Sequence, residues 1–367
     1  MKRREFLKSA GIGLTASAVA APAIAQSTPE IKWRLTSSFP KSLDTLWGAA
    51  ETFAKYVGES TDNKFQVQTF AAGEIVPGLQ AADAVSNGTV EACHTATYYY
   101  IGKDPTFALF CAVPFGLNSR QQNAWFYDGD GLKLMNDFTK KYNLYNLLAG
   151  NTGCQMGGWF RKEIKEVADL SGLKFRIGGF AGNVLAKLGV VAQQIAGGDI
   201  YPALEKGTID AAEWVGPYDD EKLGFQRVAP FYYYPGWWEG ALNLSFYVGK
   251  AKWEELPQQY KDALESACRD STIETMAKYD VQNPQALRRL VAAGTQLRPF
   301  PREVMQACYK AAFELYDETA AKNENFRKVY EPWKAFRDSQ FQWFRVAEST
   351  FDNFVYFMHA QEQQQCR

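Results

Sequence analysis

Residues 173–215 read LKFRIGGFAGNVLAKLGVVAQQIAGGDIYPALEKGTIDAAEWV, and this stretch decides the fold class. Apolar residues at every second position predict strands at Leu173–Ile177 and Ile209–Val215. Apolar residues at helical spacing predict short helices at Ala181–Leu188 and Ile200–Glu205. Strands that alternate with helices are typical of α/β proteins with a mostly parallel sheet.

The same alternation extends on both sides of this stretch. Upstream, the pattern predicts strands at 31–36, 65–70 and 90–95, with helices at 43–58 and 79–86. Two more strands are expected at 156–161 and 242–248. From Lys250 onward the chain is largely helical, apart from Thr295–Phe300 and its flanking prolines. The predicted fold is therefore α/β, with two lobes followed by long C-terminal helices.

Length and charge exclude several classes of protein. The chain has 367 residues, 46% of them hydrophobic and 22% charged, which suits a globular protein with two domains. Its 40 Lys and Arg residues balance 41 Asp and Glu residues without a basic block, which argues against a nucleic-acid partner. Only two histidines occur, so a three-histidine zinc site is excluded.

The first 25 residues have the pattern of a secretion signal. A twin arginine, Arg3-Arg4, precedes an uncharged stretch from Ser9 to Pro29, and Ala23-Ile24-Ala25 supplies a small-residue cleavage site. This pattern resembles a twin-arginine export signal, and it predicts a periplasmic protein. No later stretch is long and apolar enough to predict a membrane span.

The six cysteines form no Cys-x-x-Cys motif and predict no metal site. Cys268 and Cys308 both lie in helical patterns of the C-terminal third, and an oxidising periplasm would allow them to pair. The sequence leaves this disulfide open. Cys93, Cys111 and Cys154 are expected to be small buried residues.

Aromatic residues recur at roughly helical spacing in the last predicted helix: Trp333, Phe336, Phe344, Phe351, Phe354 and Phe357. Such a stripe usually covers the core of its own chain. A stripe on a terminal helix can instead contact a second chain. The pattern alone favours packing within the chain.

Arg176 is the first candidate for ligand binding. Leu173, Phe175 and Ile177 share one face of their predicted strand, so Arg176 points to the other face, beside a glycine turn at the strand's carboxyl end. Ligands of open α/β sheets bind at this end of the strands, and a guanidinium matches the two oxygens of a carboxylate. The alternative is an exposed ion pair of little energetic consequence.

Two glutamates and a glutamine form the second set of candidates. Glu213 lies among apolar residues, and a carboxylate there needs an arginine, a proton or a cation as its partner. Glu239 follows an aromatic run, and Gln155 precedes a predicted strand. Their oxygen atoms suit a hard cation such as Na⁺ or Ca²⁺. An alternative role for Glu213 and Glu239 is the acid–base pair of a glycosidase.

Several segments together resemble the solute-binding subunit of TRAP (tripartite ATP-independent periplasmic) transporters, and in particular the branch that binds α-keto acids. The resemblance covers essentially the whole chain after the signal. The segments that carry it are Ser38–Asp44, Gly73–Gly78, Tyr98–Tyr100, Leu173–Arg176, Gly197–Trp214 and Tyr234–Glu239.

The resemblance implies a two-lobed periplasmic binding-protein fold and a cation-bridged site. Arg176 would clamp the carboxylate of the solute. The side chains of Gln155, Glu213 and Glu239 and the backbone carbonyl of Trp214 would hold Na⁺, or Ca²⁺ as the alternative. The cation would bridge to the oxygen on the second carbon of the solute and to its carboxylate.

The resemblance also implies further site residues, lobes and partners. Phe39, Tyr100 and Asn151 would form walls and hydrogen bonds of the site. Lobe I would comprise residues 27–150 and about 241–300, lobe II residues 151–240, and the C-terminal helices about 301–367. The partners would be the TRAP membrane subunits and, through the last helix, a second copy of the chain.

The leading hypothesis is a receptor, and not an enzyme, that binds a small 2-oxo monocarboxylate such as pyruvate. A receptor for a 2-hydroxy acid such as lactate is the alternative within this class. From another class, a periplasmic redox enzyme exported by the twin-arginine route is disfavoured, because haem and iron–sulfur motifs are missing. A periplasmic hydrolase built on the two glutamates is the third alternative.

Overall fold

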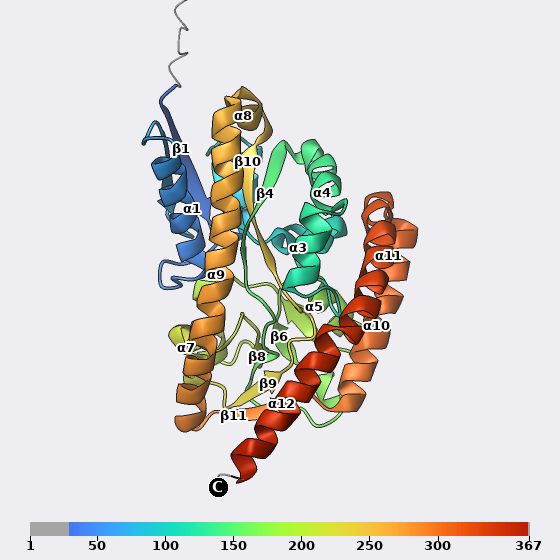
Figure 1. The fold of residues 1–367 in the computed structure, drawn as a ribbon. Coiled ribbons are helices and arrows are strands. Elements are labelled where there is room, and N and C mark those ends of the chain that lie inside the picture. Colours follow the sequence, from blue (N-terminus) through green and yellow to red (C-terminus); the bar gives the residue numbers. More distant parts are fainter. Residues whose placement is uncertain (1–28, 366–367) are drawn as a thin grey trace, which may run out of the picture.

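The structure, a computed structural model, describes residues 29–365 and contains two mixed β-sheets with helices around them (Figure 1). The first sheet, sheet A, has the order β2-β1-β3-β10-β4. Its strands are β1 (Ile31–Ser37), β2 (Phe65–Phe70), β3 (Ala92–Thr95), β4 (Leu144–Asn151) and β10 (Asn243–Gly249).

The second sheet, sheet B, has the order β11-β9-β5-β8-β6-β7. Its strands are β5 (Gly158–Phe160), β6 (Lys174–Arg176), β7 (Val191–Gln193), β8 (Ala211–Ala212), β9 (Phe231–Tyr234) and β11 (Gln296–Pro299). Each sheet contains a single reversed strand. β10 runs antiparallel to β3 and β4, and β5 runs antiparallel to β8 and β9. The expectation of mostly parallel sheets is confirmed.

Helices cover both sheets, and one of them runs the length of the molecule. Helix α9 (Gln258–Ala292) is 35 residues long, and it lies alongside α1 (Leu46–Ser60) and β4 toward one end of the structure and alongside α7 (Pro217–Leu223) toward the other (Figure 1). Before α9 come α1 (Leu46–Ser60), α2 (Ala81–Ser86), α3 (Ser119–Tyr127), α4 (Gly131–Thr139), α5 (Gly179–Ala186), α6 (Gly197–Glu205), α7 (Pro217–Leu223) and α8 (Lys250–Glu255). The last helices are α9 (Gln258–Ala292), α10 (Arg302–Lys322), α11 (Glu324–Val346) and α12 (Glu348–Gln365).

Two segments cross side by side between the sheets, one from β4 to β5 and the other from β9 to β10. They are joined by backbone hydrogen bonds: Gln155 donates to the Glu239 carbonyl at 3.1 Å, and Gly236 donates to the Gln155 carbonyl at 3.0 Å. A side chain at Gly236 would place its Cβ 2.6 Å from the Gln155 carbonyl oxygen, so only glycine allows this close approach. The crossing therefore fixes Gln155 beside Glu239.

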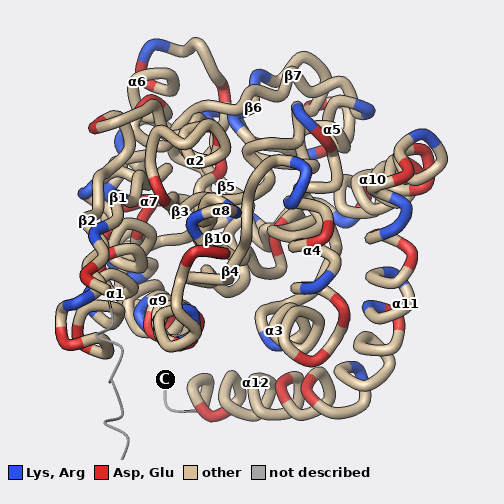
Figure 2. The backbone as a smooth tube through the Cα atoms, turned by 90° about the horizontal axis from the view of Figure 1, so that it is seen from above, with Lys and Arg blue, Asp and Glu red and all other residues tan. Residues whose placement is uncertain are grey.

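The predicted aromatic stripe is divided between two helices. Helix α11 ends at Val346, and α12 leaves it in a new direction along the edge of the molecule (Figures 1 and 2). Trp333 on α11 is buried, as expected for packing within the chain. The expectation is wrong for α12, where Phe351, Phe354 and Phe357 are exposed and no residue is buried. The turn after Val346 carries this half of the stripe away from the core.

The structure also decides the expectations about cysteines. Cys268 and Cys308 are both free and lie in separate hydrophobic clusters, so they do not form the disulfide that the sequence allowed. Cys93 and Cys111 are buried as expected, whereas Cys154 is exposed. Cys366 and the predicted signal at residues 1–25 lie outside the described residues.

Residues 29–365 contain no helix with the length and apolar character that crossing a bilayer requires. Basic and acidic segments alternate over the backbone, and no region is dominated by either sign (Figure 2). This agrees with the near-neutral composition.

Candidate functional site

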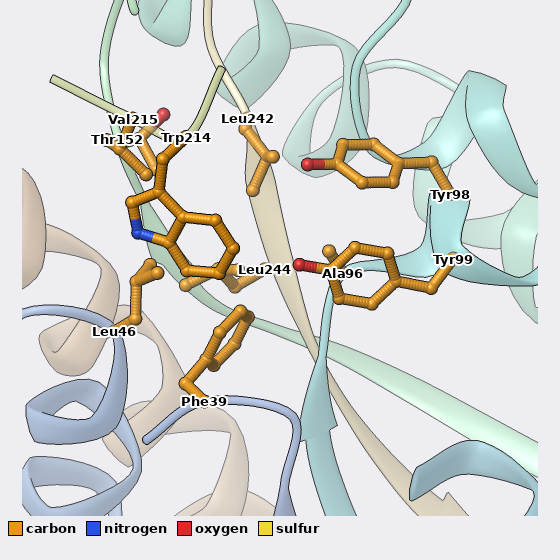
Figure 3. A pocket seen from close by; sticks show the side chains of 10 residues that line it. All are labelled: Phe39, Leu46, Ala96, Tyr98, Tyr99, Thr152, Trp214, Val215, Leu242 and Leu244. Carbon is orange, nitrogen blue, oxygen red and sulfur yellow. The ribbon is translucent and has the colours of Figure 1, made fainter. Parts of the chain in front are cut away.

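A small cavity lies where the two sheets meet (Figure 3). Its volume is about 10 Å³, which is room for roughly one water molecule. The walls come from both sheets and are mostly apolar: Phe39, Leu46, Ala96, Tyr98, Tyr99, Thr152, Trp214, Val215, Leu242 and Leu244. The hydroxyl groups of Tyr98 and Tyr99 point into the cavity, opposite Phe39 and Trp214 (Figure 3).

Arg176 is held rigidly at the carboxyl end of β6, the position predicted from the sequence. Its side chain is only 1% exposed. Its Nε donates to the Ile195 carbonyl at 3.0 Å, and one terminal nitrogen contacts the Glu213 backbone carbonyl at 2.7 Å and its side-chain Oε1 at 2.5 Å. The other terminal nitrogen, Nη2, is buried without a hydrogen-bond partner. Arg176 therefore keeps one nitrogen without a partner inside the protein.

Glu213 follows β8 directly and is fully buried. Its Oε1 accepts hydrogen bonds from Arg176 and from the Gly178 backbone at 2.7 Å, whereas its Oε2 has no partner. Burial raises the pKa of this carboxyl above its ordinary value, and the charge of Arg176 and the bond from Gly178 offset only part of that effect. Of the three partners that the sequence left open for Glu213, the structure shows an arginine, Arg176, although one carboxylate oxygen remains without a partner.

Glu239 and Gln155 supply two further oxygen atoms without partners. Glu239 Oε2 and Gln155 Oε1 are both buried and make no hydrogen bond. Burial, and then repulsion by Glu213, raise the pKa of Glu239 well above its ordinary value, against the opposing charge of Arg176 and a hydrogen bond with Tyr98. Two buried carboxylates close enough to repel each other favour either a proton or a cation between them.

The donor set fits a hard cation bound by oxygen. Unpartnered oxygens on two carboxylates and one amide are the ligand type that Na⁺ and Ca²⁺ prefer. Within residues 29–365, no group of three or more His, Cys, Asp or Glu side chains is arranged to hold a metal ion. A cation here would take its remaining ligands from amide or backbone oxygens and from the solute.

The structure distinguishes among the three consecutive tyrosines. They form a short 3₁₀ helix, η2 (Thr97–Tyr100), which turns Tyr98 and Tyr99 toward the cavity. The expected wall residue, Tyr100, instead accepts a hydrogen bond from the Ala82 backbone at 2.9 Å and faces a separate pocket beside α2. The ring of Tyr98 packs so closely on Gly179 that a Cβ there would lie 2.8 Å from it.

The other expected site residues divide into two groups. Phe39 and Trp214 line the cavity, with ring centroids 6.4 Å apart, and the Arg176 guanidinium lies 5.0 Å from the Trp214 ring. Asn151 belongs to the scaffold. Its amide nitrogen donates to Gln122 at 3.1 Å and to Asn243 at 2.9 Å, which uses both of its hydrogens.

His94, the only histidine near the cavity, has a structural environment. Its Nε2 lies 2.6 Å from the Ala149 carbonyl, and its ring packs edge-on against Phe39. Burial lowers its pKa to about 4, so the imidazole is neutral at neutral pH.

Comparison with known proteins agrees with this architecture. Residues 36–323 match the model of the bacterial extracellular solute-binding proteins of family 7, DctP. A monocarboxylate 2-oxoacid-binding periplasmic protein of Nostoc sp. strain PCC 7120 is 49% identical over 361 residues, which cover 97% of this chain and 99% of the relative.

Two solved structures extend the comparison. A TRAP transporter solute-binding protein from Bordetella bronchiseptica RB50 is 52% identical with a TM-score of 0.90, over 91% of this chain and 100% of that one. It is a mixed-occupancy dimer, with copurified calcium and picolinate bound in one active site and an apo site. A protein from Pseudoalteromonas atlantica T6c, with bound sodium and pyruvate, is 37% identical with a TM-score of 0.86, over 88% of this chain and 99% of that one. The chain therefore belongs to family 7 of the bacterial extracellular solute-binding proteins, the solute-binding proteins of TRAP transporters.

Proposed function

We propose that this protein is the periplasmic receptor of a TRAP transporter, which binds a small 2-oxo monocarboxylate such as pyruvate and delivers it to the membrane subunits. Its role is binding rather than turnover. Support comes from the 2-oxoacid-binding relative, from the neighbour with sodium and pyruvate, and from the predicted export signal.

One observation carries the proposal: a free donor and three free acceptors are buried together at the junction of the sheets. The donor is Arg176 Nη2, and the acceptors are the oxygens of Gln155, Glu213 and Glu239. Leaving such groups unpaired costs about 1–3 kcal/mol each, and more when they are charged. A ligand that carries both a cation and a carboxylate satisfies all four groups at once.

The residues of this chain then take separate roles. Arg176 Nη2 donates to the carboxylate of the solute, while the other nitrogens of Arg176 stay bonded to the protein and fix its orientation. Glu213, Glu239, Gln155 and the backbone carbonyl of Trp214 hold the cation, with Na⁺ as the first choice and Ca²⁺ as the alternative. When bound, the cation supplies the positive charge that lets an anion approach two carboxylates.

The apolar walls favour a short, uncharged tail on the solute. Phe39, Leu46 and Leu244 line the cavity, and a second carboxylate beside them would be buried without a partner. We assign lobe I to residues 27–150 and about 241–300, and lobe II to residues 151–240. Sheet A lies in the first, whereas sheet B takes most of its strands from the second.

A thermal-shift panel tests this function. The protein is unfolded and refolded to remove carried-over solute, and is then heated with 2-oxo acids, 2-hydroxy acids, dicarboxylates or sugars, in Na⁺, Ca²⁺ or chelator. Ligand at about 100 times its dissociation constant stabilises the fold by about 2.7 kcal/mol. We expect a shift only with short 2-oxo acids. A shift confined to lactate would favour the 2-hydroxy acid receptor, and no shift with any monocarboxylate would refute the proposed solute.

A further inference from the structure

Solute exchange requires this structure to open. Arg176, Glu213 and Gln155 are each at most 3% exposed, so no solute reaches them unless the two sheets move apart. Contacts that join the two sheets beside the cavity must then break. Their strength sets how long a bound solute stays.

One such contact joins helices α1 and α7 through a buried hydrogen bond. The Thr45 hydroxyl, just before α1, donates to Asp219 Oδ1 on α7 at 2.6 Å. Thr45 is 1% exposed, and Asp219 is fully buried. The other carboxylate oxygen of Asp219 accepts from the Tyr279 hydroxyl of α9 at 2.7 Å. Helix α1 packs on β2 and β4 of sheet A, whereas α7 follows β8 of sheet B.

A neighbouring ion pair strengthens the same contact at the surface. Asp44 pairs with Lys222 of α7 and also accepts from Tyr218 at 3.2 Å. Lys278 of α9 approaches Asp44 to within 2.7 Å. The buried bond of Thr45 is therefore covered by an exposed ionic contact between the same two helices.

Asp220, the next residue, ties α7 to residues 213–215, which contain Glu213 and are called the ligand segment below. Its carboxylate accepts from Trp159 of β5 at 3.0 Å, from Tyr232 of β9 at 2.7 Å and from the Val215 backbone at 3.3 Å. Val215 lies two residues after Glu213. On the other side, Leu46 follows Thr45 directly and lines the cavity. The bond between Thr45 and Asp219 thus joins two segments that both line the site, one from each sheet's side.

We propose that Asp219 is a positioning residue for solute retention, and that its bond with Thr45 is a latch that holds the ligand segment against α1 in the closed state. This inference rests on the proposed receptor function. The latch breaks when the sheets separate and forms again whenever they close, with or without solute.

The test compares three variants by stopped-flow fluorescence with pyruvate and Na⁺. Thr45→Val keeps the shape of the side chain and removes the hydroxyl, and Thr45→Ser restores it. Thr61→Val is the matched control, because Thr61 is a buried threonine at the far end of α1 whose hydroxyl bonds to the Val57 carbonyl of its own helix. We expect Thr45→Val to raise the dissociation rate about 10- to 100-fold, the range for a lost hydrogen bond to a charged group, with an unchanged association rate.

The control variants decide between a latch and a general loss of stability. Thr45→Ser is expected to restore the slow dissociation, and Thr61→Val to lower the melting temperature without faster dissociation. An unchanged dissociation rate in Thr45→Val, or equal acceleration in Thr61→Val, would overturn the latch.

A second measurement keeps the latch testable even if wild-type protein fails to bind pyruvate, which would refute only the proposed function. In solute-free protein, hydrogen exchange is followed in the peptides that contain residues 44–50 and 213–223. The latch predicts faster exchange of both peptides in Thr45→Val than in wild type. Acceleration confined to 44–50, or none at all, would show that Thr45 acts on its own helix alone and would overturn the proposal.

Discussion

The Arg176 side chain is bonded to the protein and still has one nitrogen without a partner. Three of its contacts bind it to Ile195 and Glu213, and its remaining nitrogen is free. The sequence predicted the position of this arginine at a strand end but not its pairing with Glu213, because the two residues lie 37 positions apart.

Replacing Arg176 with lysine tests whether pyruvate binding needs the planar guanidinium or only its positive charge. Lys keeps a positive charge beside Glu213 but loses the planar fork that serves protein and solute together. We expect the dissociation constant for pyruvate to rise about 10- to 100-fold by isothermal titration, with a folded protein. Arg289→Lys is the control, since Arg289 forms a similar pair with Glu221 at the surface. Equal affinities in wild type and Arg176→Lys would show that Arg176 does not contact the solute.

The buried carboxyl of Asp220 makes the free energy of unfolding depend on pH. Burial raises its pKa from 3.8 to about 7, against the hydrogen bonds from Tyr232 and Trp159. A carboxyl with a raised pKa in the folded state binds its proton more tightly than in the unfolded chain. Its stabilising contribution is therefore complete below about pH 4 and is lost as the pH rises through about 7.

We therefore expect wild type to lose unfolding free energy relative to Asp220→Asn between about pH 4 and 7. The steepest difference is about 1.4 kcal/mol per pH unit, the limit for one titrating group. Denaturant unfolding of both proteins across this range measures it. Parallel pH profiles would contradict the assignment.

The run Tyr98–Tyr100 shows that the sequence alone does not predict which side chain faces the cavity. Three identical side chains in a row carry no signal of which one faces the cavity, and the 3₁₀ turn of η2 decides it. The family resemblance points to Tyr100, which lies elsewhere, whereas Tyr98 and Tyr99 line the cavity.

At the scale of elements, regular alternation was the reliable signal. The strand at Phe65–Phe70 has the predicted bounds, the strand at Ile31–Ser37 is one residue longer at its end, and the strand at Asn243–Gly249 is shifted by one residue at both ends. Strand β9 (Phe231–Tyr234) was seen only as an aromatic run, because four bulky residues in succession show no period. Strand β4 (Leu144–Asn151) is buried almost throughout, and it too lacks the alternation that marks a half-buried strand.

Helix α12 leaves large hydrophobic side chains exposed in the single chain. Six large hydrophobic side chains on it are at least 39% exposed: Phe351, Phe354, Val355, Tyr356, Phe357 and Met358. Contiguous apolar surface of this kind marks an interaction site. The family resemblance predicts that this surface contacts a second copy of the chain.

The triple variant Phe351→Ser, Phe354→Ser, Phe357→Ser tests the dimer. Because α12 buries no residue in the single chain, we expect the melting temperature of the monomer body to stay within a few degrees. Sedimentation should show a dimer for wild type and a monomer for the variant. Ile273→Ser, at an exposed residue of α9, is the control and should remain dimeric. A wild-type monomer, or a dimeric triple variant, would contradict this prediction.

At the scale of the whole molecule, the candidate site lies where two segments of the chain cross between the two sheets. Gln155 and Glu239 lie on the crossing segments, Arg176 and Glu213 on sheet B, and Phe39 at the end of β1 in sheet A. The family resemblance identified these residues from separate segments. Their unpartnered atoms and the tightness of the cavity depend on long-range packing, which local sequence patterns do not encode.

The proposed function requires that a cation and a 2-oxo acid bind together. Calorimetric titration of pyruvate into refolded protein tests it, at constant ionic strength, with Na⁺ or with a large organic cation in its place and chelator present. We predict binding in Na⁺ that weakens at least tenfold, about 1.4 kcal/mol, when the ion is replaced. In Glu213→Gln this dependence on Na⁺ should be reduced. Equal pyruvate affinity in both solutions, with wild type and variant alike, would contradict joint binding of the cation and the 2-oxo acid.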